Sequence, residues 1–267
     1  MKFRELGRTG FAVSEIGYGL WGMSSWSGSN DQESHGSMQA AVDLNCNFFD
    51  SAWAYGEGKG DEFAGAIVAG NPGKRLYVAS KIPPLNRRWP ASPKDRYDEV
   101  FPREHVLHYA DLIRRQLGVD RIDLLQLHVW DDSWTDEKEF QDTAAQLKRD
   151  GLVASFGLSL NRWQPENGIK AIRTGLVDTV QVIYNIFDQA PEDELFPACR
   201  EMNIGVIARV PLDEGGLSGN LTVETRFPKE DWRSSYFHPD NLRATVERAE
   251  KLKALLPAGM SLPELAL

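Results

Sequence analysis

Short apolar runs alternate with longer amphipathic segments along most of the chain. Between the runs, apolar residues recur at helical spacing in residues 105–118 and 137–151, each ending at a glycine, and in residues 241–256, which end before Pro257. The apolar runs themselves predict strands near residues 15–18, 47–49, 76–80, 123–127, 154–157, 179–183 and 204–208. Strands that alternate with helices predict a parallel sheet of the α/β class.

The start of the chain departs from this alternation. The segments KFREL and AVSEI flank a Gly-rich centre, which predicts a β-hairpin. Neither the short apolar core of a signal peptide nor a run of 18 or more apolar residues is present, so we expect neither export nor membrane anchoring.

Four residues of the types that hydride chemistry uses follow successive apolar runs. Asp50 and Tyr55 follow residues 47–49, Lys81 follows residues 76–80, and His128 follows residues 123–127. Singly, each has an ordinary interpretation as a turn former, loop aromatic, solvated strand end or core histidine. In a β/α barrel, however, catalytic side chains come from the carboxyl ends of several strands, so the joint pattern favours an active site.

These four residue types suit the reduction of a carbonyl group. The carbonyl oxygen must gain a proton as carbon accepts the hydride, and Tyr55 is the candidate acid. A free tyrosine has a pKa near ~10, so use at pH 7 requires about 4 kcal/mol of stabilisation of the phenolate. A neighbouring cation such as Lys81 shifts a pKa by roughly 1 to 3 units, and Asp50 would keep that cation charged. His128 is positioned to donate a hydrogen bond to the substrate oxygen.

Further motifs occur in a fixed order around these residues. They are DSAWAYG (50–56), SKIPP with Lys81, LLQLHVW with His128, FGLSLN (156–161) and VQVIYN (180–185). With them, the chain resembles the aldo-keto reductases from residue 2 to its end. The resemblance implies a (β/α)8 TIM-type barrel in one domain, residues 1–267, whose N-terminal hairpin plugs the amino end. It also implies NAD(P)H-dependent reduction of an aldehyde or ketone, with NADP(H) as the expected cofactor and NAD(H) as the alternative.

The resemblance also implies cofactor-binding residues. Asp50, Ser159 and Gln181 would lie at the nicotinamide, the latter two on its carboxamide, whereas Leu160 interrupts the usual Ser-Asn pair and makes a direct role for Asn161 doubtful. Arg209 would stack on the nicotinamide ring, or form an ordinary ion pair instead. The pyrophosphate would meet a loop that contains Pro211, Leu212, Gly215, Gly216 and Leu217.

The substrate is expected to be a small carbonyl compound. By resemblance, its pocket would contain Trp21, Tyr55, His128 and Trp130, with ordinary packing as the other interpretation of Trp21. Four more tryptophans lie in or near loops after strands, and such aromatic surroundings suit apolar carbonyls and sugar faces equally: Trp26, Trp53, Trp89 and Trp134.

Only seven barrel strands are expected, and residues 261–267 begin a helix. The resembled family continues to an eighth strand and a basic segment that binds the adenosine end of the cofactor. We therefore expect a C-terminally truncated barrel, because seven strands would leave two unpaired edges.

Three other patterns carry less weight. GYGLWG (17–22) matches a dinucleotide-binding motif, but polar residues 23–32 follow it where a helix is required. His105 and His108 have no third ligand in pattern, so no metal is predicted. Cys46 and Cys199 do not have the spacing of a metal site or of a Cys-x-x-Cys motif, which predicts buried reduced thiols.

Composition narrows the function further. The chain has 267 residues, a net charge of −9 and a pI near 5.1, which argue against a nucleic-acid or anionic-membrane partner. With reduced cysteines and no signal peptide, we expect a cytoplasmic enzyme, and the sequence does not determine its oligomeric state. Two alternatives stay open. One is a cofactor-binding scaffold of the potassium-channel β-subunit type. The other is a Schiff-base aldolase using Lys81, which the neighbouring Asp50 disfavours.

Overall fold

The computed structural model describes residues 1–23 and 29–267, and they form two compact units. The first unit comprises Met1–Val182 and Pro191–Ile207, and the second comprises Ile183–Ala190 and Ala208–Leu267. A single domain over residues 1–267 stays a prediction.

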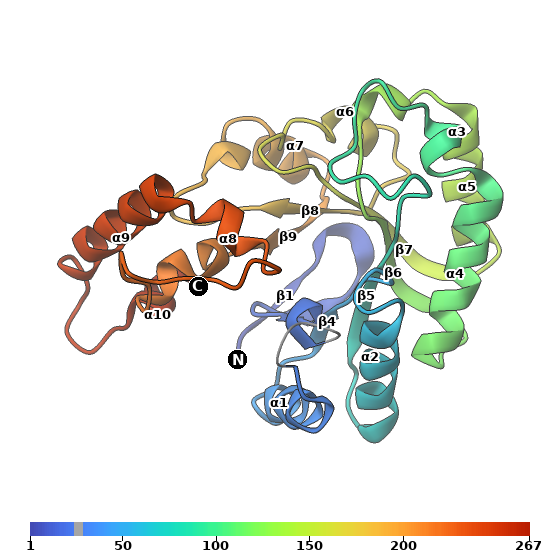
Figure 1. Cartoon of the computed structure of the whole chain (residues 1–267). Coiled ribbons are helices and arrows are strands. Elements are labelled where there is room, and N and C mark those ends of the chain that lie inside the picture. The colour runs from blue at the N-terminus through green and yellow to red at the C-terminus, as the bar shows by residue number, and fades with distance from the viewer. Residues whose placement is uncertain (24–28) are drawn as a thin grey trace. The chain divides into compact units, whose positions relative to one another are not determined.

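A parallel sheet organises the first unit. Its strands follow one another in chain order, with parallel pairing from β3 through β8: β3 Tyr18–Gly19, β4 Phe48–Asp50, β5 Tyr77–Ile82, β6 Ile122–Leu127, β7 Val153–Ser159, β8 Thr179–Ile183 and β9 Gly205–Arg209. The sheet curves like part of a barrel, and α2, α4 and α5 run along its outer face (Figure 1). This confirms the expected α/β class and the seven parallel strands.

The first strand begins later than predicted. Residues 15–18 were expected, but β3 covers Tyr18–Gly19. The carbonyl of Ile16 accepts from the Ser14 hydroxyl at 2.8 Å and lies 3.4 Å from the Cys46 thiol. Since side chains occupy this carbonyl, the ladder starts only after Gly17.

Helices connect the strands of the first unit: α1 Asp31–Asp43, α2 Lys59–Gly70, α3 Tyr97–Val100, α4 Arg103–Leu117, α5 Lys138–Arg149, α6 Ile169–Ile172 and α7 Leu195–Glu201. The predicted helices 105–118 and 137–151 are confirmed as α4 and α5. The expected polar loop 23–32 is partly wrong, because α1 already begins at Asp31, where the Asn30 side chain accepts from the Glu33 amide at 3.1 Å. Gly65 lets α2 approach α4 closely, since a Cβ there would lie 2.6 Å from the Leu117 carbonyl oxygen.

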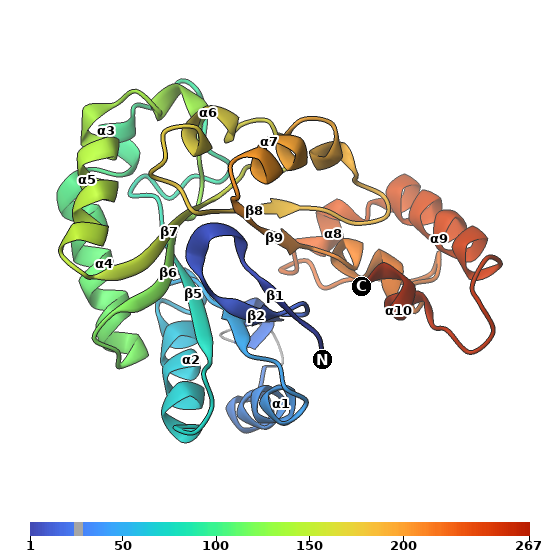
Figure 2. The same cartoon turned by 180° about the vertical axis from the view of Figure 1, so that it is seen from behind.

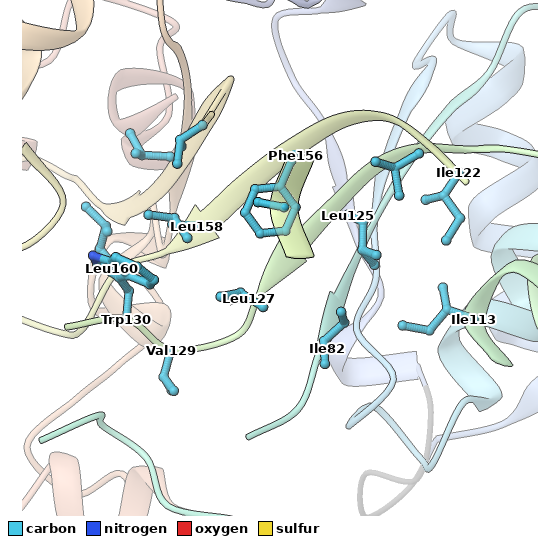
Figure 3. Close-up of a cluster of buried hydrophobic side chains, with 14 of the residues drawn as sticks. Ile82, Ile113, Ile122, Leu125, Leu127, Val129, Trp130, Phe156, Leu158 and Leu160 are labelled. Atoms are coloured by element: carbon cyan, nitrogen blue, oxygen red, sulfur yellow. The ribbon is translucent and has the colours of Figure 1, made fainter. Parts of the chain in front are cut away.

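Side chains on the two faces of the sheet enter two separate cores. The larger, helix-side core lies between the outer face of the sheet and the helices, and Figure 3 labels ten of its residues: Ile82, Ile113, Ile122, Leu125, Leu127, Val129, Trp130, Phe156, Leu158 and Leu160. On the inner face, Phe48, Ala79 and Leu124 pack against Leu6, Phe11 and Val13 of the N-terminal segment. Along β5, alternation of side chains produces this division, since Ala79 packs with the N-terminal segment while Val78 and Ile82 enter the helix-side core.

The N-terminal segment is the predicted hairpin. Strands β1 (Phe3–Glu5) and β2 (Ala12–Ser14) pair antiparallel, and their connection lies within the curve of the sheet (Figure 2). The Arg8 amide donates to the Asn203 carbonyl at 2.8 Å, and a Cβ at Gly7, where φ is +53°, would lie 2.1 Å from the Gly205 amide nitrogen. Because Asn203 and Gly205 lie at the start of β9, the hairpin closes the amino end of the strands.

Three helices contribute to the second unit. They are α8 Arg233–Tyr236, α9 Pro239–Lys253 and α10 Leu262–Ala266. The predicted helix 241–256 corresponds to α9 and is shifted toward its Pro239 start, a favoured first-turn position for proline. Leu217, Ala249 and Leu262 form the local core. No helix among residues 1–23 and 29–267 has the length and hydropathy needed to cross a membrane.

Candidate active site

Polar side chains line the inner face of the sheet at its carboxyl end. Asp50 lies two residues beyond Phe48 on β4, and Lys81 lies two beyond Ala79 on β5, so each shares the face of the apolar residue before it. The register pairs Lys81 with Gln126, and Ser159 with Gln181. The hairpin therefore closes one end of the inner face, and a polar cluster occupies the other end.

The Lys81 ammonium group is the centre of this cluster. It donates to both carboxylate oxygens of Asp50 at 2.9 and 2.8 Å, and to the Ser51 carbonyl at 2.7 Å. The Gln181 amide also donates to Asp50, at 2.8 Å. Only 1% of the Lys81 side chain is exposed, against 18% for Asp50. Residues of two other strands thus donate hydrogen bonds to the Asp50 carboxylate, which stays partly exposed.

Two opposing effects act on the pKa of Lys81. Burial disfavours the ammonium form, but the Asp50 carboxylate, and after it Tyr55, outweigh burial, so the pKa of Lys81 is raised above its ordinary value. Lys81 is therefore a fixed cation at neutral pH. This counts against the Schiff-base alternative, in which the lysine must lose its proton to act as a nucleophile.

Tyr55 and His128 complete the predicted set of four. Tyr55 lies in the turn between β4 and α2, and its ring centroid is 5.1 Å from the Lys81 nitrogen. His128 directly follows β6, and its ring lies edge-on to the Tyr55 ring with centroids 5.9 Å apart. The structure thus brings Asp50, Tyr55, Lys81 and His128 together at the carboxyl end of β4, β5 and β6.

A buried carboxylate that sequence reasoning missed lies on the other side of β5. Asp61 of α2 is fully buried and accepts from the Ser80 hydroxyl at 2.7 Å. Burial raises the pKa of Asp61 to about 6, although the Ser80 hydrogen bond and the charge of Lys81 act in the opposite direction. The signal was its position, since Asp61 lies on the same helix face as buried Ala64 and Gly65.

The tryptophans do not all lie where the resemblance suggested. Trp130 is fully buried, its indole nitrogen donates to Asp132 at 2.8 Å, and it lies in the helix-side core near Leu160 (Figure 3). Trp89 instead has 46% of its surface exposed and lies edge-on to His128, with ring centroids 5.8 Å apart. Trp89 rather than Trp130 therefore presents accessible aromatic surface beside His128.

The other tryptophans have mixed surroundings. Trp21, in a 3-10 turn just after β3, is 40% exposed. Trp53 packs edge-on against Tyr109, and Trp134 is buried with its indole nitrogen on the Asp95 carbonyl at 2.8 Å. Trp26 lies outside the described residues.

Ser159 and Gln181 suit the amide end of a nicotinamide. Both are almost fully buried on adjacent strands, and Gln181 already contacts Asp50. One hydroxyl and one amide at neighbouring strand ends offer both donors and acceptors to a carboxamide. Their chemistry therefore fits the expected cofactor.

The expected phosphate-binding loop belongs to the second unit and begins after Arg209, the last residue of β9. Pro211 has no amide hydrogen, and the Gly215 and Leu217 amides both donate to the Leu212 carbonyl at 3.0 Å. A Cβ at Gly216 would lie 2.7 Å from a carboxylate oxygen of Asp213. The Gly215 and Leu217 amides are therefore engaged within the loop, and the nearby Asp213 carboxylate opposes the binding of an anion.

The structure also shows the surroundings of the GYGLWG motif, the two histidines of α4 and the two cysteines. GYGLWG leads into a 3-10 turn at Trp21–Met23. The His105 ring nitrogen lies 2.8 Å from the Pro83 carbonyl oxygen, and His108 is exposed. Cys46 and Cys199 are free and buried, and burial raises the pKa of the Cys199 thiol to about 12. Across residues 1–23 and 29–267, no three His, Cys, Asp or Glu side chains form a group able to hold a metal.

Known proteins share this architecture. The chain is 27% identical over 266 residues to the aldo-keto reductase yakc of Schizosaccharomyces pombe, whose name specifies NADP(+), covering 94% of this chain and 74% of the relative. It is 25% identical to the NADH-specific methylglyoxal reductase of Escherichia coli K12, covering 96% and 81%. Among solved structures, the glycerol dehydrogenase AKR11B4 from Gluconobacter oxydans matches with a TM-score of 0.81 and 26% identity, covering 99% of this chain and 81% of that one.

The chain is also similar to a protein family as a whole. The model of the Aldo/keto reductase family matches residues 15–267, which include every strand of the parallel sheet and all four clustered polar residues. Members of this family are oxidoreductases that generally use nicotinamide cofactors and act on small carbonyl compounds. From the geometry and this match together, the chain belongs to the aldo/keto reductase family.

Proposed function

We propose that this protein reduces an aldehyde or ketone to an alcohol with NAD(P)H, using Tyr55 as the general acid. The observation that carries the proposal is the Lys81 ammonium group, which is buried, paired with Asp50 and 5.1 Å from the Tyr55 ring. A fixed cation beside a phenol stabilises the negative charge that develops on the phenol oxygen as its proton leaves. Tyr55 could then donate this proton to the carbonyl oxygen.

His128 would orient the substrate. Its ring adjoins Tyr55, so a carbonyl oxygen within reach of the phenol is also within reach of the imidazole. A hydrogen bond from His128 would polarise that carbonyl and stabilise the developing alkoxide. Asp50 would hold Lys81 in place and remain a carboxylate throughout.

Ser159 and Gln181 would bind the carboxamide of the nicotinamide, and the bound cofactor would supply the hydride. Arg209, Pro211, Leu212, Gly215, Gly216 and Leu217 remain proposed contacts for the rest of the cofactor. NADP(H) is the proposed cofactor and NAD(H) the alternative, and the names of two relatives specify one each. Trp21 and Trp130 remain proposed pocket residues, although Trp130 is buried in this structure.

The test is the substitution Tyr55→Phe, which keeps the ring and removes the acid. The rate of aldehyde reduction, followed by loss of reduced-nicotinamide absorbance, should fall by at least about 10²-fold. Cofactor affinity, measured by fluorescence titration of NADPH and NADH, should change little, because the hydroxyl is assigned to the substrate.

A matched control is Tyr109→Phe. Tyr109 packs against Trp53 and His105, away from the Lys81 pair, so its hydroxyl should not affect turnover. A Tyr55→Phe enzyme that keeps more than about a tenth of the wild-type rate would falsify the assignment. Cofactor binding by the wild-type protein with no turnover of any aldehyde or ketone would instead favour the scaffold function.

A further inference from the structure

Trp89 and Tyr55, the proposed acid, both contact the ring of His128. The rings of Tyr55 and Trp89 both lie nearly perpendicular to the imidazole, at 79° and 81°, with centroids 5.9 and 5.8 Å away. Trp89 keeps 46% of its surface exposed despite this contact. An open indole surface thus lies beside the residue proposed to orient the carbonyl.

The segment that carries Trp89 is anchored on both sides. On one side, the Leu85 amide donates to the Val100 carbonyl at 2.9 Å. On the other, the Asn161 side chain forms a pair of hydrogen bonds with the Ala91 backbone, since its oxygen accepts from the Ala91 amide at 3.1 Å and its nitrogen donates to the Ala91 carbonyl at 3.2 Å. This pair joins the segment after β5 to the segment after β7.

Asn161 is built into the fold at this point. Its side chain is 95% buried, leaving 5% exposed, and its nitrogen also donates to Gln164 at 3.0 Å. Leu160, the residue that interrupts the Ser-Asn pair, is buried in the helix-side core, and its amide donates to the Gln181 carbonyl at 2.9 Å. Asn161 is consequently engaged with Ala91 rather than with Ser159 or Gln181.

We propose that Asn161 is a positioning residue that holds Trp89 beside His128, and that Trp89 determines specificity by providing an aromatic wall for the substrate. This inference rests on the proposed carbonyl reduction. The paired amide bonds fix the backbone two residues after Trp89, so they limit where its ring can lie. A wall of this kind favours carbonyl compounds with an aromatic or extended apolar substituent over short ones.

The charged neighbours of Trp89 support this class of substrate. Arg87 lies over the Trp53 ring at 5.2 Å, and Arg88 pairs with Asp95 at 3.3 Å. Both guanidinium groups are thus directed to partners within the protein. The indole ring is then the main contact that this segment offers to a substrate at His128.

The experiment compares kcat/KM for benzaldehyde and for propanal in five forms: wild type, Trp89→Ala, Trp89→Phe, Asn161→Ala and the double substitution Trp89→Ala with Asn161→Ala. Trp89→Ala should lower kcat/KM for benzaldehyde about tenfold, mainly through KM, while propanal changes little. Trp89→Phe should restore most of the loss, because it returns an aromatic face. Asn161→Ala should reproduce the Trp89→Ala pattern, and the double substitution should be no worse than the poorer single one, because both act through one ring.

Amide hydrogen exchange tests the hydrogen bonds between Asn161 and the Ala91 backbone independently of activity. Exchange at Ala91 should be slow in the wild type and faster in Asn161→Ala. The control is Trp163→Ala, which removes a 68% exposed tryptophan two residues after Asn161 and should change neither exchange nor substrate preference.

The outcomes separate the two proposals. If the wild type reduces both aldehydes and Trp89→Ala lowers both by the same factor, the specificity role is wrong and the proposed function stands. Unchanged substrate preference and unchanged Ala91 exchange in Asn161→Ala would overturn the positioning role. A wild type that reduces no carbonyl compound would overturn the proposed function and this inference with it.

Discussion

Each end of the parallel strands contains a lysine–aspartate ion pair, and the two pairs differ in what surrounds them. At the amino end, Asp178 accepts from Arg8 at 3.1 Å, from Lys148 at 2.5 Å and from the Phe156 amide at 2.9 Å. At the carboxyl end, Lys81 is the buried partner, and its Asp50 has one further donor, Gln181. The first arrangement neutralises a carboxylate with two cations and joins the hairpin to the sheet. The second keeps a cation beside a phenol and a histidine.

The comparison shows how one kind of interaction serves two purposes. Asp178 uses its donors to hold Arg8, α5 and β7, so its partners are structural elements. Lys81 has Asp50, Ser51 and Tyr55 as neighbours, and among them the phenol can exchange a proton with a substrate. An aspartate pairs with a lysine at either end, but only the carboxyl end adds a group that can react.

The largest expected effect comes from the substitution Lys81→Met at the carboxyl end of the strands. The substitution removes the cation beside Tyr55, so turnover of an aldehyde should fall by about 10²-fold or more. The pH dependence of the remaining rate should also change, because the phenol loses the charge that stabilises its ionised form. Steady-state rates measured across pH for both proteins check this.

Lys148→Met is the matched control at the amino end. Lys148 also pairs with a buried aspartate, but 29% of its side chain is exposed and Arg8 remains as a second cation. Its loss should cost about 1 kcal/mol of stability or less and leave turnover unchanged. Equal losses of turnover in the two variants would mean that Lys81 acts only by supporting the fold.

An effect on stability rather than on turnover is expected from Asp61→Asn, which tests the buried carboxylate behind Lys81. The folded pKa of Asp61 is raised from 3.8 to about 6, so the folded state binds this proton more tightly than the unfolded state does. The stability from this group is therefore fully present below pH 3.8 and is lost as pH rises through about 6. Asparagine does not titrate, so the free energy of unfolding of the wild type should decline by about 3 kcal/mol relative to Asp61→Asn across this range.

Chemical denaturation of both proteins at several pH values measures that decline. Asp193→Asn is a suitable control, since Asp193 is exposed and should give a nearly constant difference from wild type. A wild-type curve parallel to that of Asp61→Asn would show that the Asp61 carboxylate is not destabilised by its burial.

A loss of stability smaller than the decline expected for Asp61 is expected from Asp178→Asn at the amino end. The substitution removes the negative charge from two half-buried cations but keeps an oxygen for the Phe156 amide. We expect a loss of about 2 kcal/mol in the free energy of unfolding, because both cations can regain water. Turnover per folded molecule should stay at the wild-type value, and a large loss of turnover without loss of stability would contradict the division between the two ends.

Much of the fold could be predicted because it follows local sequence patterns, such as apolar runs and glycines at helix ends. The runs at 76–80 and 123–127 became β5 and β6, and the glycine stops at Gly118 and Gly151 follow α4 and α5 closely. The start of β3 could not be predicted, because the Ile16 carbonyl is taken by Ser14 and approached by Cys46, the latter from a distant part of the chain. A side chain that competes for a backbone group leaves no signal in local periodicity.

The sequence by itself determined the strand ends and therefore the grouping of Asp50, Tyr55, Lys81 and His128, because successive parallel strands must bring their carboxyl ends to one edge. Only the tertiary structure decided which aromatic rings adjoin that group. Trp130 is two residues from His128 in sequence but is buried in the helix-side core, whereas Trp89 comes from another segment and contacts His128. It also decided that Asn161 binds the Ala91 backbone and that Asp61 is buried behind Lys81. Such contacts depend on how segments distant in the chain pack together, which no local pattern of hydrophobic and polar residues records.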